Sequence, residues 1–425
     1  MLKQYKTCLH NRLIGKEAQQ DNEGEWTQIK EAIIESANEV IRTQTTSNRN
    51  EWWDESCKLI MTQKNESRNK YLQVKTRATH EIHEAKRTEA NRICREKKRI
   101  WINKKIRQIE VASNINDARK FFKEVQFFNK QKSVSAISCK DKSGNILSEH
   151  GDILRRWRQY FCDLQTISSG TEDLISNNII LSNSGEVPPS TYYEVNQVIE
   201  KLKIHKAEGS DNIPAELIKQ GGTELKTRIH KLIMKIWDEE TLPTEWMEGI
   251  ICPIYKKGDR MICTNYRPIS LLNVVYNIFS ILINNRLTKI VESKLGDCPN
   301  GISTKPIHNR QHIYSETNYQ KISWIQHRDA QYFIDYTHAF DSVFRDKITE
   351  CLNKYEIQSK LIKLIARALQ DTKARDKVNQ NYTEKSEITT GVKQGNLLSA
   401  TLFSIVIEDI LKQLELRGNI STCLK

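Results

Sequence analysis

The sequence predicts an α+β protein with a long basic helical arm at its N-terminal end, followed by a mixed domain of helices and strands. Proline is absent before residue 188 and no glycine falls between Gly24 and Gly144, and a stretch without either breaker favours long helix. Beyond residue 190 glycine and proline recur, and short apolar runs alternate with helical patterns. We therefore expect a helical basic arm over 1–132, a hairpin, helix and linker over 133–190, and a catalytic-type α/β domain over 191–425.

Charge and composition favour a polyanionic partner. The 425 residues include 66 Lys and Arg against 53 Asp and Glu, a net charge of +13. Nucleic acid is favoured over a membrane, because no apolar run reaches the length of a transmembrane helix. The first residues hold no apolar signal-peptide core, so we expect an intracellular protein, cytoplasmic or nuclear. The ten cysteines form no Cys-x-x-Cys pair, which favours reduced, buried thiols over a zinc site or a disulfide framework.

Nearly all of the excess charge lies in residues 61–132, which hold 20 Lys and Arg against 8 Asp and Glu. The densest cations are Arg92, Arg95, Lys97, Lys98, Arg99, Lys104, Lys105 and Arg107. Two interpretations stay open: a solvated charged helix, or a helix that binds the phosphates of nucleic acid through sequence-independent, salt-sensitive contacts. The aromatic pairs Trp52–Trp53 and Phe121–Phe122, which flank the dense part, are interpreted as core.

The segment between arm and domain has three recognisable parts. Asp141 to Asn145, between two short apolar runs, predicts a hairpin within 135–149. The apolar spacing in 151–164 predicts a helix, and the Ser-, Asn- and Thr-rich residues 165–190 predict a linker. The following helix is expected to begin with a capping box formed by Thr191 and Glu194.

The most distinctive stretch of the domain runs from Tyr332 to Asp341. Its first half predicts a short strand buried on both faces that ends at Asp335. A carboxylate in that position costs free energy unless a partner or a metal compensates it. The stretch by itself leaves two interpretations open: either aspartate caps the following helix, or Asp335 is a metal ligand.

Four further blocks surround this stretch. They are a loop at 206–214, a strand that ends in a basic turn at 250–259, a return at 265–272 that leads into a helix at 274–290, and a Gln-Gly loop at 391–399 that leads into a helix at 400–415. Each block alone is a weak signal. Their order matches what phosphoryl transfer to a nucleotide requires: cations for the triphosphate, carboxylates for Mg²⁺, and a loop that places base and template.

These blocks resemble the fingers and palm motifs of the reverse transcriptases of non-LTR, LINE-type retrotransposons. The likeness covers residues 190–425 and, more loosely, 50–165. It implies a partial right-hand polymerase, with fingers and palm built as an antiparallel sheet with packed helices and without a thumb. It also implies RNA-directed DNA polymerase activity, with an RNA template, a DNA primer and dNTP as partners and Mg²⁺ as cofactor.

The resemblance implies a role for residues around the buried strand. Asp335 would ligate the catalytic Mg²⁺ with help from the backbone carbonyl of Tyr336. Phe340 would be the steric gate that meets the sugar 2′ position and favours deoxynucleotides. Asp341 would be structural and would orient the turn after the strand.

The resemblance also implies where the nucleotide binds. Lys257 and Arg267 would hold the triphosphate, and the guanidinium of Arg267 could make a bidentate contact. Gln394 and Gly395 would line the nucleotide and template site.

The sequence also departs from the family pattern. The family's Tyr/Phe-Ala-Asp-Asp motif is expected after the Gln-Gly loop, but the 425 residues contain no Asp-Asp pair. Asn396, Leu397 and Ala400 replace customary residues, and Glu408–Asp409, the only late acidic pair, is expected on a helix surface. A single aspartate cannot organise two-metal chemistry.

From these departures we expect an enzyme truncated at both ends that is inactive as this chain, with Mg²⁺ binding weakened or lost. The competing interpretation is a non-enzymatic nucleic-acid-binding protein, or a pseudogene-like fragment, that uses the basic helix 61–132.

Overall fold

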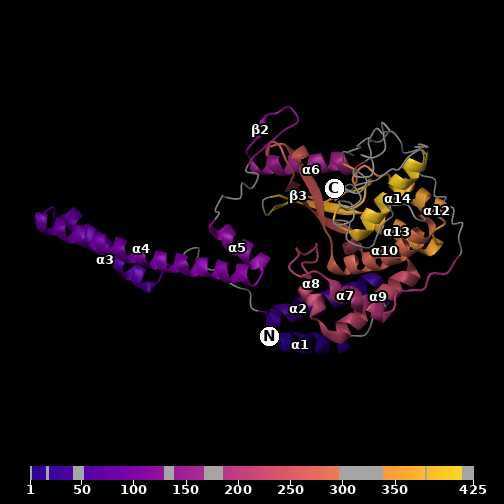
Figure 1. Ribbon diagram of the computed structural model, residues 1–425, viewed down its shortest axis with the longest axis horizontal. Coiled ribbons are helices and arrows are strands. Elements are labelled where there is room, and N and C mark those ends of the chain that lie inside the picture. The colour runs from indigo at the N-terminus through magenta and orange to yellow at the C-terminus, as the bar shows by residue number, and fades with distance from the viewer. Residues whose placement is uncertain are drawn as a thin grey trace, which may run out of the picture. The chain divides into compact units, whose positions relative to one another are not determined.

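The computed structural model describes residues 2–15, 19–41, 52–128, 138–166, 185–295, 338–378 and 381–413 (Figure 1). The chain forms two compact units. One unit is residues 42–135, and the other combines residues 1–41 with 136–425.

The smaller unit is a helical hairpin with a third helix against it. Its helices are α3 (Glu55–Gln73), α4 (Arg77–Asn114) and α5 (Ala118–Phe128). Antiparallel packing of α3 and α4 is marked by hydrogen bonds from Lys97 Nζ to Asp54 Oδ2 (2.6 Å) and from Lys86 Nζ to Gln63 Oε1 (3.3 Å). The expectation of one helix over 61–132 is therefore wrong. The chain turns at residues 74–76, where the side chain of Thr76 forms a capping box and starts α4 without glycine or proline.

Two aromatic residues that we expected in the core lie at the surface of this unit. Trp53 is 39% exposed and Phe122 is 61% exposed. Each ring instead packs edge-to-face against its neighbour in sequence, with ring centroids 5.4 Å apart in both pairs. The unit offers few apolar residues for these rings to pack against, because most of the surface of α4 is charged.

The larger unit holds the other helices and all the strands of the described residues. Its elements before the main sheet are α1 (Leu2–Ile14), α2 (Asn22–Val40), β1 (Cys139–Lys140), β2 (Ile146–Leu147), α6 (His150–Gln165), α7 (Tyr192–Lys201), α8 (Ala215–Lys219), α9 (Gly222–Glu239) and η2 (Thr244–Met247). The remaining elements are β3 (Glu248–Tyr255), η3 (Cys263–Asn265), β4 (Tyr266–Leu271), α10 (Val274–Leu295), α12 (Arg345–Lys354), α13 (Ser359–Leu369), β5 (Lys373–Val378), β6 (Asn381–Tyr382), β7 (Ser386–Glu387) and α14 (Leu397–Gln413).

Several elements confirm the prediction. The hairpin lies at β1–β2, the helix expected at 151–164 is α6, and the capping box of Thr191 and Glu194 begins α7. The strand with its basic turn and return is the β3–β4 hairpin. The helices expected at 274–290 and 400–415 are α10 and α14, with shifted ends.

The main sheet is mixed, with strand order β4-β3-β5-β6 and β7 paired to β5. Strands β3 and β4 are antiparallel, with Ile254 opposite Arg267. Strands β3 and β5 are parallel, with Ile250 opposite Arg375. The expectation of an antiparallel sheet is wrong for this pair. The chain passes through α10, α12 and α13 between β4 and β5, and such a long crossover permits a parallel pairing.

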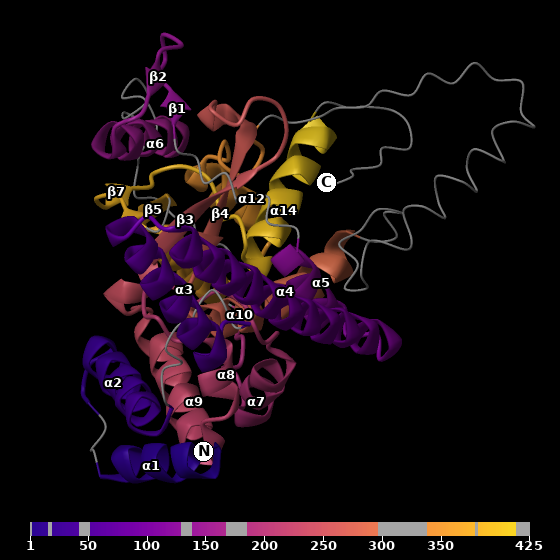
Figure 2. The ribbon, with the colours of Figure 1, turned by 90° about the vertical axis from the view of Figure 1, so that its left-hand side faces the viewer.

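Helices lie on both sides of this sheet. Figures 1 and 2 show α6 on one side and α7, α9 and α10 on the other. Trp157 and Phe161 of α6 pack with Ile251 and Val378 of the sheet in one hydrophobic cluster. A second and larger cluster joins α1, α2 and the helices α7–α10 and α12–α14. Within the part of the chain that the structure describes, no helix has the length and hydrophobicity needed to span a membrane.

Helices α1 and α2 belong to this larger unit. Trp26 of α2 meets Trp246 edge-to-face, with ring centroids 5.6 Å apart. Arg228 of α9 donates to Glu25 at 3.0 Å, and both side chains are less than a tenth exposed. The structure thus divides the expected arm of 1–132, because α1 and α2 have an apolar face to bury and α4 has almost none.

Candidate functional site

The β3–β4 hairpin presents both predicted triphosphate-binding cations to solvent. Lys257 lies in the turn and Arg267 on β4, and both are exposed. The turn is rigid, because Gly258 has φ 91° and a Cβ there would lie 2.7 Å from Asn265 Nδ2. The Tyr255 hydroxyl donates to the Gly258 carbonyl at 2.6 Å. The hairpin therefore offers two unburied positive charges on a fixed backbone.

The Gln-Gly loop is bound to β4 by its backbone. The Ser270 amide donates to the Gln394 carbonyl at 2.8 Å. Gly395 has φ 123°, and a Cβ at this position would lie 2.8 Å from the Ser270 carbonyl oxygen. Only glycine fits such a close approach in that conformation. The predicted residues Gln394 and Gly395 are thus held beside the strand that carries Arg267.

The turn at residues 338–342 packs against the same loop. The Val392 amide donates to the Phe340 carbonyl at 2.9 Å. The Phe340 ring stacks on Phe403 of α14, with centroids 4.9 Å apart. Asp341 is 4% exposed, and its Oδ2 accepts a 2.7 Å hydrogen bond from Gln394 Nε2. The structure therefore brings Phe340, Asp341 and Gln394 together, although about fifty residues separate them in sequence.

Burial dominates the electrostatics of this cluster. Desolvation raises the pKa of Asp341 to about 7, and hydrogen bonds from the side chains of Gln165 and Gln394 oppose the rise. Lys393, next in the loop, is 7% exposed, and its ammonium group lies 4.8 Å from the centroid of the Tyr276 ring. Burial, with the positive charge of Arg345 nearby, lowers the pKa of Lys393 to about 7.

Sequence reasoning missed Lys393 and Gln165 as members of the cluster. Gln165, expected to begin a linker, is the last residue of α6, and its carbonyl accepts from the amides of Thr389 and Thr390 at 3.0 and 3.1 Å. No local pattern marks Gln165, because these contacts join residues more than two hundred positions apart. Lys393 could have been suspected from its place between a buried valine and the glutamine of the loop.

The predicted metal ligands Asp335 and Tyr336 lie outside the described residues. Within the ranges that are described, no group of three His, Cys, Asp or Glu side chains could hold a metal ion. Asp409, expected on a helix surface, is 8% exposed and pairs with Lys354 at 3.1 Å. That expectation is wrong because α14 packs against α10 and α12, which bury much of its surface.

The basic residues of α4 fall into two groups. Lys97 and Lys105 are partly buried and pair with Asp54 (2.6 Å) and Glu124 (3.3 Å), and Arg92 lies 3.8 Å from Glu96. The others are exposed and meet no acid among the described residues: Arg95, Lys98, Arg99, Lys104 and Arg107. Part of the predicted cluster therefore stabilises the hairpin, and the rest faces solvent.

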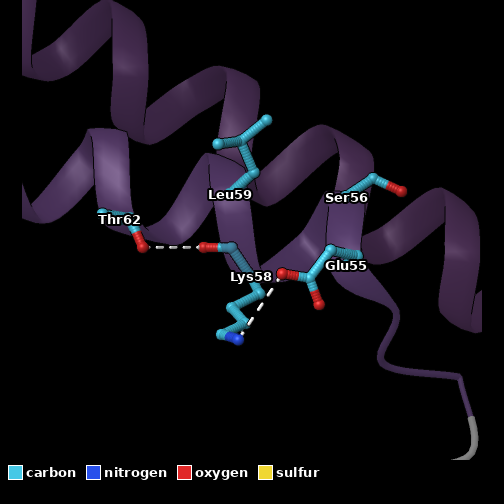
Figure 3. Close-up of a pocket in the computed structure, with 5 residues that line it drawn as sticks. All are labelled: Glu55, Ser56, Lys58, Leu59 and Thr62. Carbon is cyan, nitrogen blue, oxygen red and sulfur yellow. Dashed lines mark hydrogen bonds and ion pairs between the residues drawn. The ribbon is translucent and has the colours of Figure 1, made fainter.

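A hollow on α3 has no candidate residue in its lining. It is lined by Glu55, Ser56, Lys58, Leu59 and Thr62 (Figure 3). Lys58 and Glu55 form an ion pair at 3.5 Å, and the Thr62 hydroxyl donates to the Lys58 carbonyl at 3.0 Å. The Ser56 hydroxyl donates to Asp54 Oδ1 at 2.8 Å, so the polar side chains of the hollow are already paired and offer no set of convergent ligands.

Comparison with known proteins agrees with the geometry of the larger unit. Residues 254–424 match the family model described as reverse transcriptase (RNA-dependent DNA polymerase). This range includes the basic turn, the turn with Phe340 and Asp341, and the Gln-Gly loop. The chain therefore carries a reverse transcriptase domain.

Its relatives define the kind of reverse transcriptase. The chain is 24% identical over 235 residues to the "Transposon TX1 uncharacterized 149 kDa protein" of Xenopus laevis, an alignment that covers 52% of this chain and 17% of that protein. It is 25% identical over 252 residues to the "Probable RNA-directed DNA polymerase from transposon BS" of Drosophila melanogaster, covering 56% and 27%. It is 26% identical over 187 residues to the "Retrovirus-related Pol polyprotein from type-1 retrotransposable element R2" of Popillia japonica, covering 41% and 24%.

The domain belongs to the reverse transcriptases of non-LTR, LINE-type retrotransposons. The alignments span only 17% to 27% of the length of these curated relatives.

Proposed function

We propose that residues 191–425 form the fingers and part of the palm of an RNA-directed DNA polymerase. Such an enzyme transfers a nucleotide from a dNTP to a primer 3′-OH on an RNA template. The match of residues 254–424 to the reverse transcriptase family carries this proposal. The close packing of the turn at 338–342, the Gln-Gly loop and β4 supports it, because a nucleotide site needs these parts fixed relative to one another.

In this function each candidate residue has a distinct task. Lys257 and Arg267 bind the triphosphate from the fingers hairpin, and Phe340 meets the sugar. Gln394 and Gly395 line the nucleotide and template site. Asp335 and the carbonyl of Tyr336 would hold Mg²⁺, since carboxylate and carbonyl oxygens are the ligands that this cation prefers. The bound cation would neutralise charge on the reacting phosphate.

Binding of the nucleotide tests this function without requiring turnover. The 425-residue protein is mixed with an RNA template and a DNA primer that ends in a dideoxynucleotide, and the affinity for each dNTP is measured. We expect the dNTP complementary to the template to bind more tightly than the other three, and Arg267→Ala to weaken all four. Affinities that are the same for all four dNTPs and unchanged in Arg267→Ala would contradict the proposed function.

We further propose that the 425-residue polypeptide does not itself extend a primer. It contains Asp335 but no adjacent aspartate pair, and nucleotidyl transfer with two metal ions needs more than one carboxylate to hold them. Primer extension on an RNA template with Mg²⁺ and dNTPs measures this. We expect no difference between the polypeptide and its Asp335→Asn variant. Robust extension that Asp335→Asn abolishes would overturn the proposed inactivity.

A second candidate function, nucleic-acid binding by the basic hairpin, follows from one observation. The five exposed cations of α4 meet no acid within the described part of the chain. Uncompensated cations on one helix suit phosphate groups, whose neutralisation releases counterions. This function needs no catalysis, so it can be tested independently of polymerase activity.

Charge substitutions separate this candidate from general basicity. The test variant replaces Arg95, Lys98 and Arg99 by glutamine. The matched control replaces Lys201, Lys203 and Lys231, which are exposed in the other unit. We expect the test variant to reduce the slope of log affinity for RNA against log salt by about 2, since each phosphate contact contributes about 0.7–0.9. An equal reduction in both variants would leave no special role for α4.

A further inference from the structure

The Asp341–Gln394 pair combines a buried carboxyl with a partly exposed amide. Asp341 is 4% exposed, and its Oδ2 lies 2.7 Å from Gln394 Nε2. A buried acid thus accepts from an amide that is itself partly exposed.

This pairing determines which end of the Gln394 amide faces outward. A primary amide has a donating nitrogen and an accepting oxygen, whereas an ionised carboxylate only accepts. In the structure the nitrogen points to Asp341, to which it donates at 2.7 Å, so the oxygen points away from it. Gln394 is partly exposed, and its amide oxygen meets no donor among the residues that the structure describes. The exposed end of the side chain is an acceptor.

The backbone on both sides of Gln394 is held in place. The Ser270 amide donates to the Gln394 carbonyl, and Gly395 approaches the Ser270 carbonyl too closely for any Cβ. On the other side, Gly391 has φ 75°, and a Cβ there would lie 2.8 Å from the Asp341 backbone. With the backbone of the loop held at these points, the hydrogen bond to Asp341 is the contact that orients the Gln394 side chain.

We infer that Asp341 is a positioning residue that holds the Gln394 amide with its oxygen turned toward a hydrogen-bond donor of the incoming deoxynucleotide. This inference rests on the proposed nucleotide-binding function of the domain. The donor is a sugar hydroxyl or a base amino group, since phosphate oxygens cannot donate. The hydrogen bond from Gln394 to Asp341 therefore adds to the other hydrogen bonds that join the turn with the sugar gate to the Gln-Gly loop.

The first test observes the amide directly and does not depend on function. The full chain is labelled with ¹⁵N in glutamine side chains, and Gln394→Met identifies the resonance pair of Gln394. We expect this pair to be shifted from free glutamine amides and slow to exchange with water. Asp341→Ala should move it to the free position, and Asp341→Asn, which retains an accepting oxygen, should preserve much of the shift.

A matched control perturbs the same turn without touching the carboxyl. The Thr390 hydroxyl donates to the Asp341 backbone carbonyl at 3.2 Å, so Thr390→Val removes a neighbouring hydrogen bond only. We expect it to leave the Gln394 resonances in place. An unchanged Gln394 amide in Asp341→Ala would overturn the inference, whether or not the protein binds nucleotides.

The second test asks whether the position of the amide matters for the ligand. Affinity for the complementary dNTP is measured on the blocked template–primer for Asp341→Ala, Gln394→Ala and the double variant. We expect each single variant to lose about tenfold and the double variant to lose no more than either, because both remove the same contact. If Asp341→Ala binds the complementary dNTP with full affinity while Gln394→Ala binds it more weakly, Asp341 does not position the amide and the inference is overturned. A wild-type chain that binds no dNTP would instead refute the proposed function.

Discussion

Asp376 is a buried aspartate of the larger unit whose ionisation is unfavourable. It lies on β5 with no exposed surface, and its Oδ1 has no hydrogen-bond partner among the described residues. Thr383 donates to Oδ2 at a long 3.3 Å. Burial raises the pKa of Asp376 to about 7, against small opposing effects of Thr383 and Arg158. The acid is therefore accommodated best in its neutral form.

This pKa predicts a loss of stability with rising pH. The folded protein holds a proton on Asp376 up to about pH 7, whereas the unfolded chain releases it near the ordinary aspartate pKa of 3.8. The contribution is fully present below pH 3.8 and is lost as pH rises through 7. Asp376→Asn should raise the free energy of unfolding by on the order of 3 kcal/mol at pH 8 and change it little at low pH.

Urea denaturation at pH 4.5 and pH 8 measures the difference. The control Asp238→Asn changes an exposed aspartate of α9 and should leave the pH dependence as it is. Asp211 and Asp341 also have a pKa raised to about 7 by burial. The unfolding free energy of the Asp376→Asn variant should therefore still fall with rising pH, but less steeply than that of the wild type. Identical slopes in Asp376→Asn and wild type would contradict the assignment.

At the level of elements, α2 is held to α9 by a buried ion pair. Arg228 donates to Glu25 at 3.0 Å and to the Leu13 carbonyl at 2.9 Å. The Trp26 indole beside it donates to Glu245 at 2.8 Å. Two helices that are some two hundred residues apart in sequence therefore depend on charged contacts with little access to water.

Breaking this pair on one side should cost more than removing both charges. Arg228→Met leaves the Glu25 carboxylate buried without its partner, and we expect a loss of about 3–5 kcal/mol in unfolding free energy. The double variant Glu25→Met, Arg228→Met should recover most of that loss, because an apolar pair has no charge to desolvate. Equilibrium denaturation of both variants measures these values.

An exposed ion pair on α12 is the control. Lys347 and Glu350 lie 2.7 Å apart with side chains 38% and 48% exposed, so Lys347→Met should cost less than about 1 kcal/mol. If the double variant were as unstable as Arg228→Met, packing rather than charge would explain the loss.

At the level of the whole molecule, the two units differ in how much apolar surface they bury. The buried apolar residues in the described part of the smaller unit are Cys57, Ile60, Ala90 and Ala112. The larger unit has two extensive hydrophobic clusters. Because stability of a compact unit grows with the surface that it buries, the smaller unit is expected to be the weaker one.

Calorimetry should therefore resolve two unfolding transitions. Ala90→Asp places a charge between α3 and α4 and should lower only the first transition. Trp26→Ala removes a fully buried ring of the larger unit and should lower only the second, by an amount that corresponds to about 3–5 kcal/mol. A single transition that both substitutions shift equally would show that the units unfold together.

Local patterns account for what the sequence predicted correctly. The hairpin at β1–β2, the capping box at Thr191 and the β3–β4 hairpin each depend on a few neighbouring residues, so their signals survive in one sequence. The mixed sheet could not be predicted in this way, because the parallel pairing of β3 and β5 joins residues more than one hundred positions apart. The position of Asp335 stays a prediction, since it lies outside the described residues.

The sequence by itself determined the class of protein, through a basic turn, an aspartate-ended apolar run and a Gln-Gly loop in that order. It also identified Lys257, Arg267, Phe340 and Gln394 as candidates. Only the tertiary structure decided that Asp341 is buried against the Gln394 amide, that Asp409 is covered, and which cations of α4 remain exposed. Burial and hydrogen bonding depend on residues distant in the chain, whereas capping and turn signals depend on near neighbours.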